Sequence, residues 1–268
     1  MSKAFQKSFA MRPSKVLAKL RAGGVVNCFK LNFADARAAE LAALFGFDCL
    51  WTCLEHTAND WSDVEKQIYA AKSQDTDIVV RVERGSYSDL IRPLELDATG
   101  IIVPHVMNLA DAKQIVWQTR FHPVGRRPLD SGNADGSYCN VPLADYLRQA
   151  NEQRFVILQI EDPEPLAELD EIAALPGYDM LLFGPGDFSH AVGAPGQMDH
   201  PEVVDARKRV AEACRKHGKF AATVGSTATA PELIAMGYQF INIGADVLGL
   251  NQYCRKLLED FDGAINSL

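Results

Sequence analysis

Polar and charged side chains follow several apolar segments of this chain at the points where those segments end. The stretch LWTCLEHTAND changes from apolar to polar at Glu55 and His56, and VVRVERG carries Arg81 inside an apolar run. Further along the chain, LQIED contains Glu161 and FGPGDFS contains Asp187. A base, a cation and two carboxylates make an acid–base or metal site if the fold brings these segment ends together.

The two later acids, Glu161 and Asp187, suit a hard divalent cation. Mg²⁺ and Mn²⁺ prefer carboxylate oxygens, take few protein ligands and leave positions open for water and substrate. Gly184, Pro185 and Gly186 come directly before Asp187. This GPG sequence leaves backbone N–H groups uncovered near an expected helix start, which is a cradle for a carboxylate. The alternative is a pair of solvated acids that cap helices.

Arg81 and His56 are the other candidates for chemistry. A guanidinium inside an apolar strand needs an anionic partner, because an unpaired buried charge is costly. That partner is either Glu83 or another acid of the fold, or the carboxylate of a bound substrate. An imidazole titrates near neutral pH, so His56 is a candidate general base, the alternative being a structural histidine.

Eight short apolar segments recur at nearly regular intervals. They are nearly continuous rather than alternating, as in parallel strands that are covered on both faces. The segments are GVVNCFKLN, DCLWTCLE, DIVVRVE, GIIVPHV, FVILQIE, DMLLFGP, KFAATVG and FINIGAD.

The segments between these strands have helical spacing. Asp35 is an expected N-cap, and the helix that follows it places four apolar side chains on one face. These side chains are Ala38, Leu41, Ala42 and Phe45. Asp60 and Asp63 have the spacing of a capping box at the start of a second helix, over residues 60–72. Residues 109–119 and 200–217 follow the same pattern.

Strand and helix alternate eight times without a repeat motif, which predicts a single (β/α)8 TIM barrel over residues 1–268. Residues 1–12 form an irregular N-terminal segment in this prediction. An open doubly wound sheet is the alternative, but the GxGxxG motif typical of it does not follow the first strand. The stretch 121–150 is rich in Pro, Gly, Asn and Asp, and we expect it to be a long loop that serves as a lid or subunit contact.

Composition excludes several classes of protein. The chain has 268 residues, a net charge of −8 and an isoelectric point of about 5.3, which argues against a nucleic-acid-binding surface. No apolar run reaches the roughly 18 residues of a membrane span, and no signal peptide is recognisable, so we expect a cytoplasmic protein. None of the six cysteines forms a CxxC pair, which favours reduced thiols.

The motifs EHTAND, VVRVERG, QIED and FGPGDFS, in this order and spacing, resemble those of the HpcH/HpaI aldolase family. These enzymes are metal-dependent class II aldolases, such as those of 4-hydroxy-2-oxoheptanedioate and 2-dehydro-3-deoxyglucarate. They make or break carbon–carbon bonds using pyruvate. The resemblance covers nearly the whole chain and implies a TIM barrel of the phosphoenolpyruvate/pyruvate type.

The resemblance also implies roles for particular residues. The metal ligands of the family match Glu161 and Asp187, and its pyruvate-contacting glutamine and arginine match Gln159 and Arg81. The histidine of the family matches His56. The backbone amides that hold the pyruvate carboxylate in the family match those around Gly184 to Asp187, with Pro185, Gly186 and Ser189 as further substrate-binding candidates in the same segment.

Three positions depart from the pattern of the family. Cys53 stands where the best-known members have an aspartate that pairs with the histidine. Glu95, in a later helix, matches a second acid and is a candidate to replace that aspartate in catalysis. Lys30 stands where a tryptophan is usual, and it is a candidate to bind the distal carboxylate of a substrate, to pair with Glu55 or to form a Schiff base.

The sequence therefore predicts a carbon–carbon lyase that cleaves or forms a 4-hydroxy-2-oxo acid, with pyruvate and an aldehyde as its small-molecule partners. The expected cofactor is Mg²⁺ or Mn²⁺, with Co²⁺ as a further candidate. The resemblance implies a homo-oligomer, a trimer or hexamer, with sites completed by neighbouring subunits. The alternatives are a related lyase of CoA thioesters, which the basic VGRRP segment could contact, a Schiff-base aldolase, and a 2-oxo-acid-binding barrel without catalysis.

Overall fold

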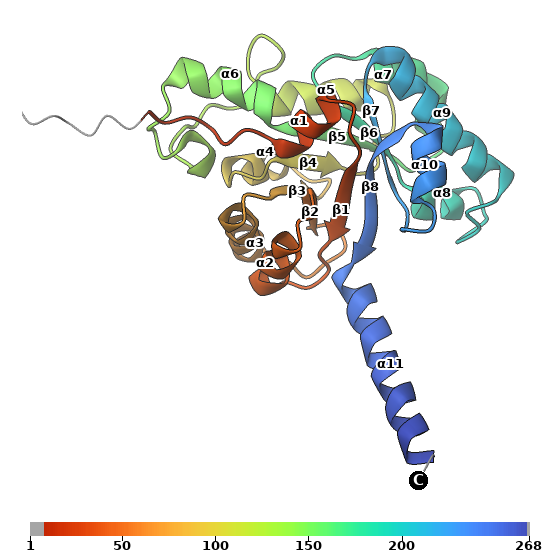
Figure 1. Ribbon diagram of the computed structural model, residues 1–268. Coiled ribbons are helices and arrows are strands. Elements are labelled where there is room, and N and C mark those ends of the chain that lie inside the picture. The colour runs from red at the N-terminus through yellow and green to blue at the C-terminus, as the bar shows by residue number, and fades with distance from the viewer. Residues whose placement is uncertain (1–7, 267–268) are drawn as a thin grey trace, which may run out of the picture.

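The computed structural model describes residues 8–266, which contain a closed barrel of eight parallel strands (Figure 1). Each strand pairs with the next in the chain, and β8 closes the barrel by pairing with β1. The predicted (β/α)8 barrel is therefore confirmed. The strands are β1 Val26–Lys30, β2 Cys49–Cys53, β3 Asp77–Arg81, β4 Gly100–Val103, β5 Phe155–Ile160, β6 Met180–Phe183, β7 Phe220–Val224 and β8 Tyr238–Ala245.

Helices surround the barrel. Each of the eight predicted apolar segments overlaps one of the strands. Two short 3-10 helices, η1 Ala134–Gly136 and η2 Glu164–Glu168, lie in the connections. The α-helices are α1 Lys15–Arg21, α2 Ala36–Leu44, α3 Trp61–Ser73, α4 Tyr87–Glu95, α5 Leu109–Thr119, α6 Leu143–Gln153, α7 Leu169–Ala174, α8 Pro185–Ala191, α9 Pro201–His217, α10 Ala230–Met236 and α11 Asp246–Asn266.

Polar caps fix the helix ends where the sequence predicts them. The side chain of Asp35 accepts a hydrogen bond of 2.8 Å from the backbone N–H of Arg37 at the start of α2. Asp60 and Asp63 form the expected capping box at the start of α3. Gly218 ends α9 with a φ of 67°, a left-handed conformation that glycine adopts without a steric penalty. These caps satisfy backbone groups that lack partners within the helices.

The barrel interior changes from apolar to polar toward the carboxyl ends of the strands. Side chains of one strand that point inward are two residues apart, so Lys30, Arg81, Gln159 and Asn242 follow inward-facing apolar residues on β1, β3, β5 and β8. The apolar floor below them includes Cys28, Cys49, Trp51, Val79, Ile157, Leu182 and Phe240. The fold thus places a layer of polar side chains at one end of a dry barrel.

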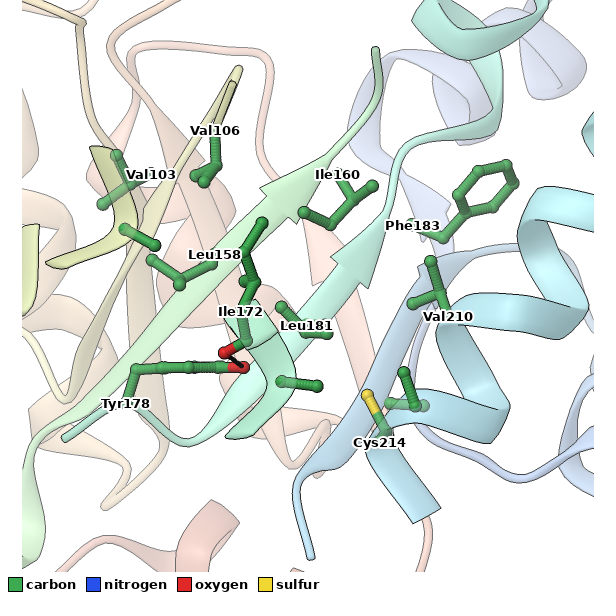
Figure 2. Close-up of a cluster of buried hydrophobic side chains, with 14 of the residues drawn as sticks. Val103, Val106, Leu158, Ile160, Ile172, Tyr178, Leu181, Phe183, Val210 and Cys214 are labelled. Atoms are coloured by element: carbon green, nitrogen blue, oxygen red, sulfur yellow. Dashed lines mark hydrogen bonds between the residues drawn. The ribbon is translucent and has the colours of Figure 1, made fainter. Parts of the chain in front are cut away.

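A second apolar layer joins the outer faces of β4, β5 and β6 to the surrounding helices (Figure 2). In Figure 2, Phe183 of β6 lies against Val210 of α9, and Tyr178 donates a hydrogen bond of 2.8 Å to the carbonyl oxygen of Ile172 in α7. Each fully buried side chain of this kind contributes about 1.5–3 kcal/mol relative to an exposed one. This packing holds β5 and β6, which lead into the segments of Glu161 and Asp187.

The predicted core face of the first long helix is wrong by one position. The buried residues of α2 are Ala39, Ala42 and Ala43. Leu41 and Phe45 are 57% and 79% exposed, because these longer side chains point away from the barrel while the alanines allow α2 to pack closely against its neighbours. An apolar period alone gives a helical face but does not say which edge of it meets the barrel.

The long stretch 121–150 is not a lid over the carboxyl ends of the strands. Its last part belongs to α6, and the loop before it follows α5, which runs back toward the beginnings of the strands. At that end Arg120 bonds Asp179, just before β6, at 2.6 Å. The loop is also internally bonded, because buried Arg127 pairs with buried Asp135 at 3.0 Å. In Figure 1 this region lies at the opposite end of the molecule from α11.

The C-terminal helix α11 projects away from the barrel (Figure 1). Its first residue, Asp246, anchors it by accepting hydrogen bonds from the backbone N–H groups of Asn32 and Phe33, at 2.8 and 3.0 Å. None of its described residues is buried. No helix in the described part of the chain is long and apolar enough to cross a membrane.

Candidate active site at the carboxyl ends of the strands

A cavity of about 570 Å³ opens at the carboxyl ends of the strands. Active sites of TIM barrels lie at this end, because the loops that follow the strands meet there. Most of the residues that the sequence singles out line this one cavity. Its lining includes Lys30, Trp51, His56, Arg81, Gln159, Gly184, Pro185, Gly186, Asp187 and Asn242.

Glu161 and Asp187 are side-chain neighbours at the cavity, and Asp187 lines the cavity itself. The side chain of Glu161 is only 1% exposed and accepts hydrogen bonds from the amide nitrogen of Gln159 and from the backbone N–H of His105. Burial raises the pKa of Glu161 to about 7, the hydrogen bond and charge of His105 oppose this shift, and Asp187 adds to it. Two carboxylates held this closely repel each other when both are ionised.

The glycine before α8 is required by this arrangement. A methyl group at Gly184 would lie 2.8 Å from both Cβ and Oε2 of Glu161 and 3.0 Å from the amide nitrogen of Gln159. Any other residue at Gly184 must therefore push these side chains apart. Gly186, two residues later, has no atom within 4 Å of such a methyl group. The GPG segment thus combines one glycine needed for close packing with one that is open to the cavity.

Arg81 is paired with Glu55 rather than with Glu83. The Nε atom of Arg81 lies 2.9 Å from Oε2 of Glu55 at the ends of the adjacent strands β3 and β2. The same Oε2 atom lies 3.6 Å from Nε2 of His56, whose side chain is half exposed. Glu55 therefore holds a carboxylate between the guanidinium and the imidazole that the sequence predicts to act in catalysis.

Cys53 lies beside this group but not against the imidazole of His56. Its Sγ atom is 3.3 and 3.2 Å from Nε and Nη2 of Arg81 and accepts a hydrogen bond of 3.4 Å from the backbone N–H of His56. The thiol is fully buried. Cys53 thus fills the space of the expected acid, while Glu55 supplies the negative charge.

His105 lies between Glu55 on one side and Glu161 and Asp162 on the other. It was not singled out from the sequence. Its Nδ1 atom lies 2.8 Å from Asp162 and 3.8 Å from Glu161, and its Nε2 atom lies 3.7 Å from Glu55. Burial lowers the pKa of His105, but the hydrogen bond that its ring donates to Asp162 and the charges of Glu161, Asp162 and Glu55 raise the pKa above its ordinary value. Its backbone has a φ of 48°, which is uncommon for a residue other than glycine.

Two overlapping groups of side chains here have the donor atoms of a divalent metal site. Glu161 and Asp187 form one, with carboxylate oxygens that suit hard cations. Glu55, His105 and Glu161 form the other, with one donor atom from each within 4.8 Å of the others. Glu161 belongs to both groups, so it is the most central candidate ligand in the described part of the chain.

Lys30 enters the cavity from β1 and has no close ionic partner. Among residues 8–266 its Nζ atom makes no hydrogen bond or ion pair, and it lies 5.7 Å from the centre of the Trp51 ring. Burial and the nearby charge of Arg81 lower the pKa of Lys30, while Cys53, Glu55 and Asp246 oppose the shift. Lys30 is a cation whose surroundings in the cavity leave room for an anionic group.

The sequence matches the HpcH/HpaI aldolase/citrate lyase family over residues 28–251. The chain belongs to this family. It is 35% identical to the hydroxypyruvate/pyruvate aldolase of Pseudomonas aeruginosa over 246 residues, 91% of each chain. It is 30% identical to the 5-keto-4-deoxy-D-glucarate aldolase of an Enterobacter species over 251 residues, which are 93% of this chain and 97% of the relative.

Solved structures of the family agree with this assignment. An HpcH/HpaI aldolase/citrate lyase family protein from Burkholderia cenocepacia superposes with a TM-score of 0.86 at 30% identity, over 93% of this chain and 99% of the other. The resemblance noted in the motifs EHTAND, VVRVERG, QIED and FGPGDFS is therefore confirmed. The prediction of an enzyme is confirmed too, because the named relatives are aldolases, which are carbon–carbon lyases.

Two residues that the sequence placed in the site lie elsewhere. Glu95 ends α4, close to the beginning of β4, whereas His56 follows the carboxyl end of β2. Its nearest charged neighbours include Arg127 and Asp135 of the long loop, and burial raises the pKa of Glu95. Within one chain, Glu95 therefore lies away from His56. The spacing along the sequence gave no information on which end of α4 faces the cavity.

Ser189 is the second residue outside the cavity. It is fully buried, its hydroxyl donates a hydrogen bond of 2.7 Å to the carbonyl oxygen of Gly186, and it accepts one of 2.9 Å from the N–H of Gly196. Both partners belong to α8 and the turn after it. Ser189 therefore shapes the segment that carries Asp187 and is not free to bind a substrate.

Sequence reasoning missed His105, which had a visible signal, and noted Asp162 at a strand end without giving it a role. His105 follows β4 in GIIVPHV and lies at a strand end like Glu55, so the same strand-end criterion selects it. Asp162 directly follows Glu161 in QIED. Only the closed barrel shows that the ends of β2, β4 and β5 meet at the imidazole of His105.

Proposed function

We propose that this protein is a divalent-metal-dependent aldolase that cleaves the C3–C4 bond of a 4-hydroxy-2-oxo acid. The products are pyruvate, or a related 2-oxo acid, and an aldehyde, and the reverse reaction forms the same bond. The observation that carries this proposal is the contact between Glu161 and Asp187 at a cavity that also holds Arg81, Gln159 and His56, in a member of an aldolase family.

The carboxylates fit a resident divalent cation. Glu161 is buried beside Asp187 with its pKa raised to about 7, which is the signature of a site that favours neutralisation by a proton or a cation. We propose Mg²⁺ or Mn²⁺ as the ion that these two residues hold, with Co²⁺ as a substitute. When bound, the ion supplies Lewis-acid stabilisation of negative charge on the 2-oxo group.

The 2-oxo acid is proposed to lie against the start of α8 and the end of β5. Gly184, Pro185, Gly186 and Asp187 line the cavity at the start of α8. Pro185 has no N–H and the N–H of Gly184 donates a hydrogen bond of 3.0 Å to the carbonyl oxygen of Ile160, so the N–H groups proposed to hold the carboxylate of the substrate are those of Gly186 and Asp187. Gln159 is 2% exposed and its Oε1 atom has no hydrogen-bond partner, so this side chain has capacity left for a ligand.

His56 is the proposed base for the proton transfer. It takes the proton of the C4 hydroxyl as the C3–C4 bond breaks, so C4 becomes the aldehyde and the bonding electron pair becomes the enolate of the 2-oxo acid. Protonation of that enolate at C3 gives pyruvate. Arg81 stabilises the developing negative charge, and Glu55 orients both Arg81 and His56.

A retro-aldol screen coupled to lactate dehydrogenase tests this proposal. A set of 4-hydroxy-2-oxo acids is offered with Mg²⁺, Mn²⁺ or Co²⁺ after dialysis against EDTA. Pyruvate release that is lost on chelation and restored by a metal is the expected result. Full activity after exhaustive chelation contradicts the proposal. Metal-dependent pyruvate binding without turnover of any compound would instead indicate a binding protein.

The alternative of a CoA thioester substrate has lost the feature that motivated it. Within VGRRP, Arg127 is buried and bonded to Asp135 and Tyr146, and Arg126 lies against the ring of Trp117. The segment also lies away from the cavity. Side-by-side assays of free acids and CoA esters keep this alternative testable.

A homo-oligomer is part of the proposal, and α11 is its main support. This helix of 21 residues projects from the barrel with large apolar side chains exposed at helical spacing, which is an unfavourable arrangement in water for an isolated chain. The exposed set is Leu248, Leu250, Tyr253, Leu257, Leu258, Phe261 and Ile265. A second copy of the chain would cover this surface, as in closed symmetric assemblies that exchange an element.

We also propose that the protein works in the cytoplasm as a reduced protein. All six cysteines, which lie in the described part of the chain, are free, and four of them are buried. The pKa of the buried Cys214 thiol is raised to about 12 by burial, which makes this thiol unreactive. Subcellular fractionation of the cells that produce the protein tests this location.

A further inference from the structure

The cavity has a second polar end, away from the carboxylates, that the proposed reaction does not use. In a closed barrel of eight strands, β1 lies four strands from β5 in either direction, so Lys30 faces Gln159 and Glu161 across the mouth. Lys30 and Asp187 line the same cavity, so a 2-oxo acid held at Glu161 and Asp187 can extend its distal part across the mouth toward β1.

Lys30 and Trp51 are neighbours on the inner face of the barrel. They are register partners on the adjacent parallel strands β1 and β2, so their side chains point to the same side of the sheet. Trp51 is 2% exposed, and its indole N–H has no hydrogen-bond partner in the described part of the chain. A buried donor without a partner costs about 1–3 kcal/mol, and a bound acceptor would remove that cost.

Asn242 adds a third group with unused hydrogen-bonding capacity. It lies on β8, the other neighbour of β1, where it pairs with Cys28. The residue is 4% exposed, lines the cavity and has no partner for its side-chain oxygen Oδ1. A hydroxyl of a bound ligand would satisfy this acceptor, while the ammonium of Lys30 and the indole N–H of Trp51 attract the negative charge of a neighbouring carboxylate.

We infer that Lys30, with Trp51 and Asn242, forms an anion-binding subsite that selects substrates with a second acidic group at their distal end. The inference rests on the proposed aldolase function and names its substrate class, a 4-hydroxy-2-oxo acid that also carries a terminal carboxylate. Membership of the family does not specify the chemical groups in the distal half of the substrate. At the end of β1 this chain has the cation Lys30, which makes no hydrogen bond or ion pair with residues 8–266.

Lys30 has a competitor for this role. Arg207 of α9 also lines the cavity, and its Nε atom is buried without a hydrogen-bond partner. Its guanidinium lies 5.9 Å from the ring centre of Phe183, on the opposite side of the mouth from β1. A comparison of variants at Lys30 and Arg207 therefore distinguishes two positions for the distal acid.

Binding of matched 2-oxo acids tests the subsite without turnover. Calorimetry in the presence of Mn²⁺ compares 2-oxoadipate with 2-oxohexanoate, and 2-oxoglutarate with 2-oxopentanoate, since each pair differs by one terminal carboxylate. We expect the wild type to prefer at least one diacid by about tenfold or more, as for a charge-assisted hydrogen bond. Lys30→Met should lose this preference, Lys30→Arg should keep most of it, and Arg207→Met should keep it.

Three results would overturn the inference. These are equal binding of both members of each pair by the wild type, a preference that persists in Lys30→Met, and a preference lost in Arg207→Met but not in Lys30→Met. Trapping of pyruvate on Lys30 by borohydride, seen by mass spectrometry, also overturns it, because it would make Lys30 a nucleophile. Metal-dependent exchange of the methyl protons of pyruvate in D₂O tests the proposed function separately, since it needs no distal acid.

Discussion

Glu55 and Arg81 form an ion pair of 2.9 Å that joins the ends of strands β2 and β3. The carboxylate also lies 3.6 Å from the imidazole of His56. The carboxylate that lies beside this histidine is therefore that of its immediate neighbour in the sequence. Cys53, three residues before the histidine, contacts the guanidinium of Arg81 instead.

Glu55→Gln is predicted to lower kcat/KM by about tenfold to a hundredfold, because it removes the charge that orients His56 and pairs with Arg81. Cys53→Ser is the matched control and should stay within a few fold of the wild type. Cys53→Asp should not raise activity, since a second carboxylate at Arg81 replaces nothing that is missing. Steady-state kinetics measure kcat/KM for each variant. A clear increase of kcat/KM in Cys53→Asp would show that Glu55 does not orient His56.

Gly184→Ala is predicted to lower kcat/KM by about a hundredfold. The added methyl group would meet Glu161 and Gln159 at 2.8 and 3.0 Å and displace them, and small displacements of positioning groups are costly in catalysis. Gly186→Ala is the control, because its methyl group meets nothing within 4 Å. Circular dichroism confirms that both variants fold. Equal activities of the two variants would argue against a role for the Glu161 position.

The pKa of Glu161 predicts how the stability of the metal-free protein depends on pH. The folded pKa of about 7 lies above the usual value of 4.5, so the stabilising contribution of the protonated group is lost as the pH rises through about 7. Glu161→Gln does not titrate. In EDTA, the melting temperature of Glu161→Gln relative to that of the wild type should therefore rise as the pH is raised from 5.5 to 8.5.

Addition of Mn²⁺ should reverse this order at pH 8.5. A ligand that binds only the folded state raises its stability, and the wild type should bind the ion more tightly than Glu161→Gln. Thermal unfolding with and without Mn²⁺ measures both effects. A metal-induced shift of equal size in the two proteins would remove Glu161 from the ligand set.

Arg127→Met is predicted to destabilise the fold by about 3–5 kcal/mol without lowering kcat/KM at a permissive temperature. The substitution leaves the buried carboxylate of Asp135 without its cation, at the end of the barrel away from the cavity. Arg126→Met, a substitution at the exposed neighbour, is the control and should change stability little. Denaturant unfolding and kinetics at 20–25 °C provide the two readouts. A loss of kcat/KM in Arg127→Met without loss of stability would instead indicate that this loop contacts a ligand.

Phe261→Asp or Leu257→Asp in α11 is predicted to dissociate the proposed oligomer, because a charge replaces an apolar side chain at a surface that another copy covers. Glu259→Gln lies on the same helix and should leave the assembly intact. Light scattering coupled to gel filtration gives the mass of each variant. A monomeric wild type at micromolar concentration would sink the proposal of an oligomer.

The sequence by itself determined the barrel and most of the cavity. Eight apolar segments separated by helical ones allow few folds, and the ends of parallel strands meet at one face whatever the details of packing. Arg81, Gln159 and Glu161 could therefore be assigned to one site from their positions at strand ends. The start of α8 could be placed because Gly184, Pro185 and Gly186 come directly after a strand.

Only the tertiary structure decided which side chains pair and which lie outside the site. Glu95 and Ser189 were plausible site residues from the sequence. In the structure, the direction of α4 places Glu95 away from the cavity, and the hydrogen bonds within α8 hold Ser189 outside it. His105 and Glu55 became candidates through contacts between the ends of β2, β4 and β5, of which β2 and β4 are not adjacent in the barrel. Local sequence sets strand ends and helix caps, whereas the rotation of each helix and the distance between non-adjacent strands depend on packing across the whole barrel.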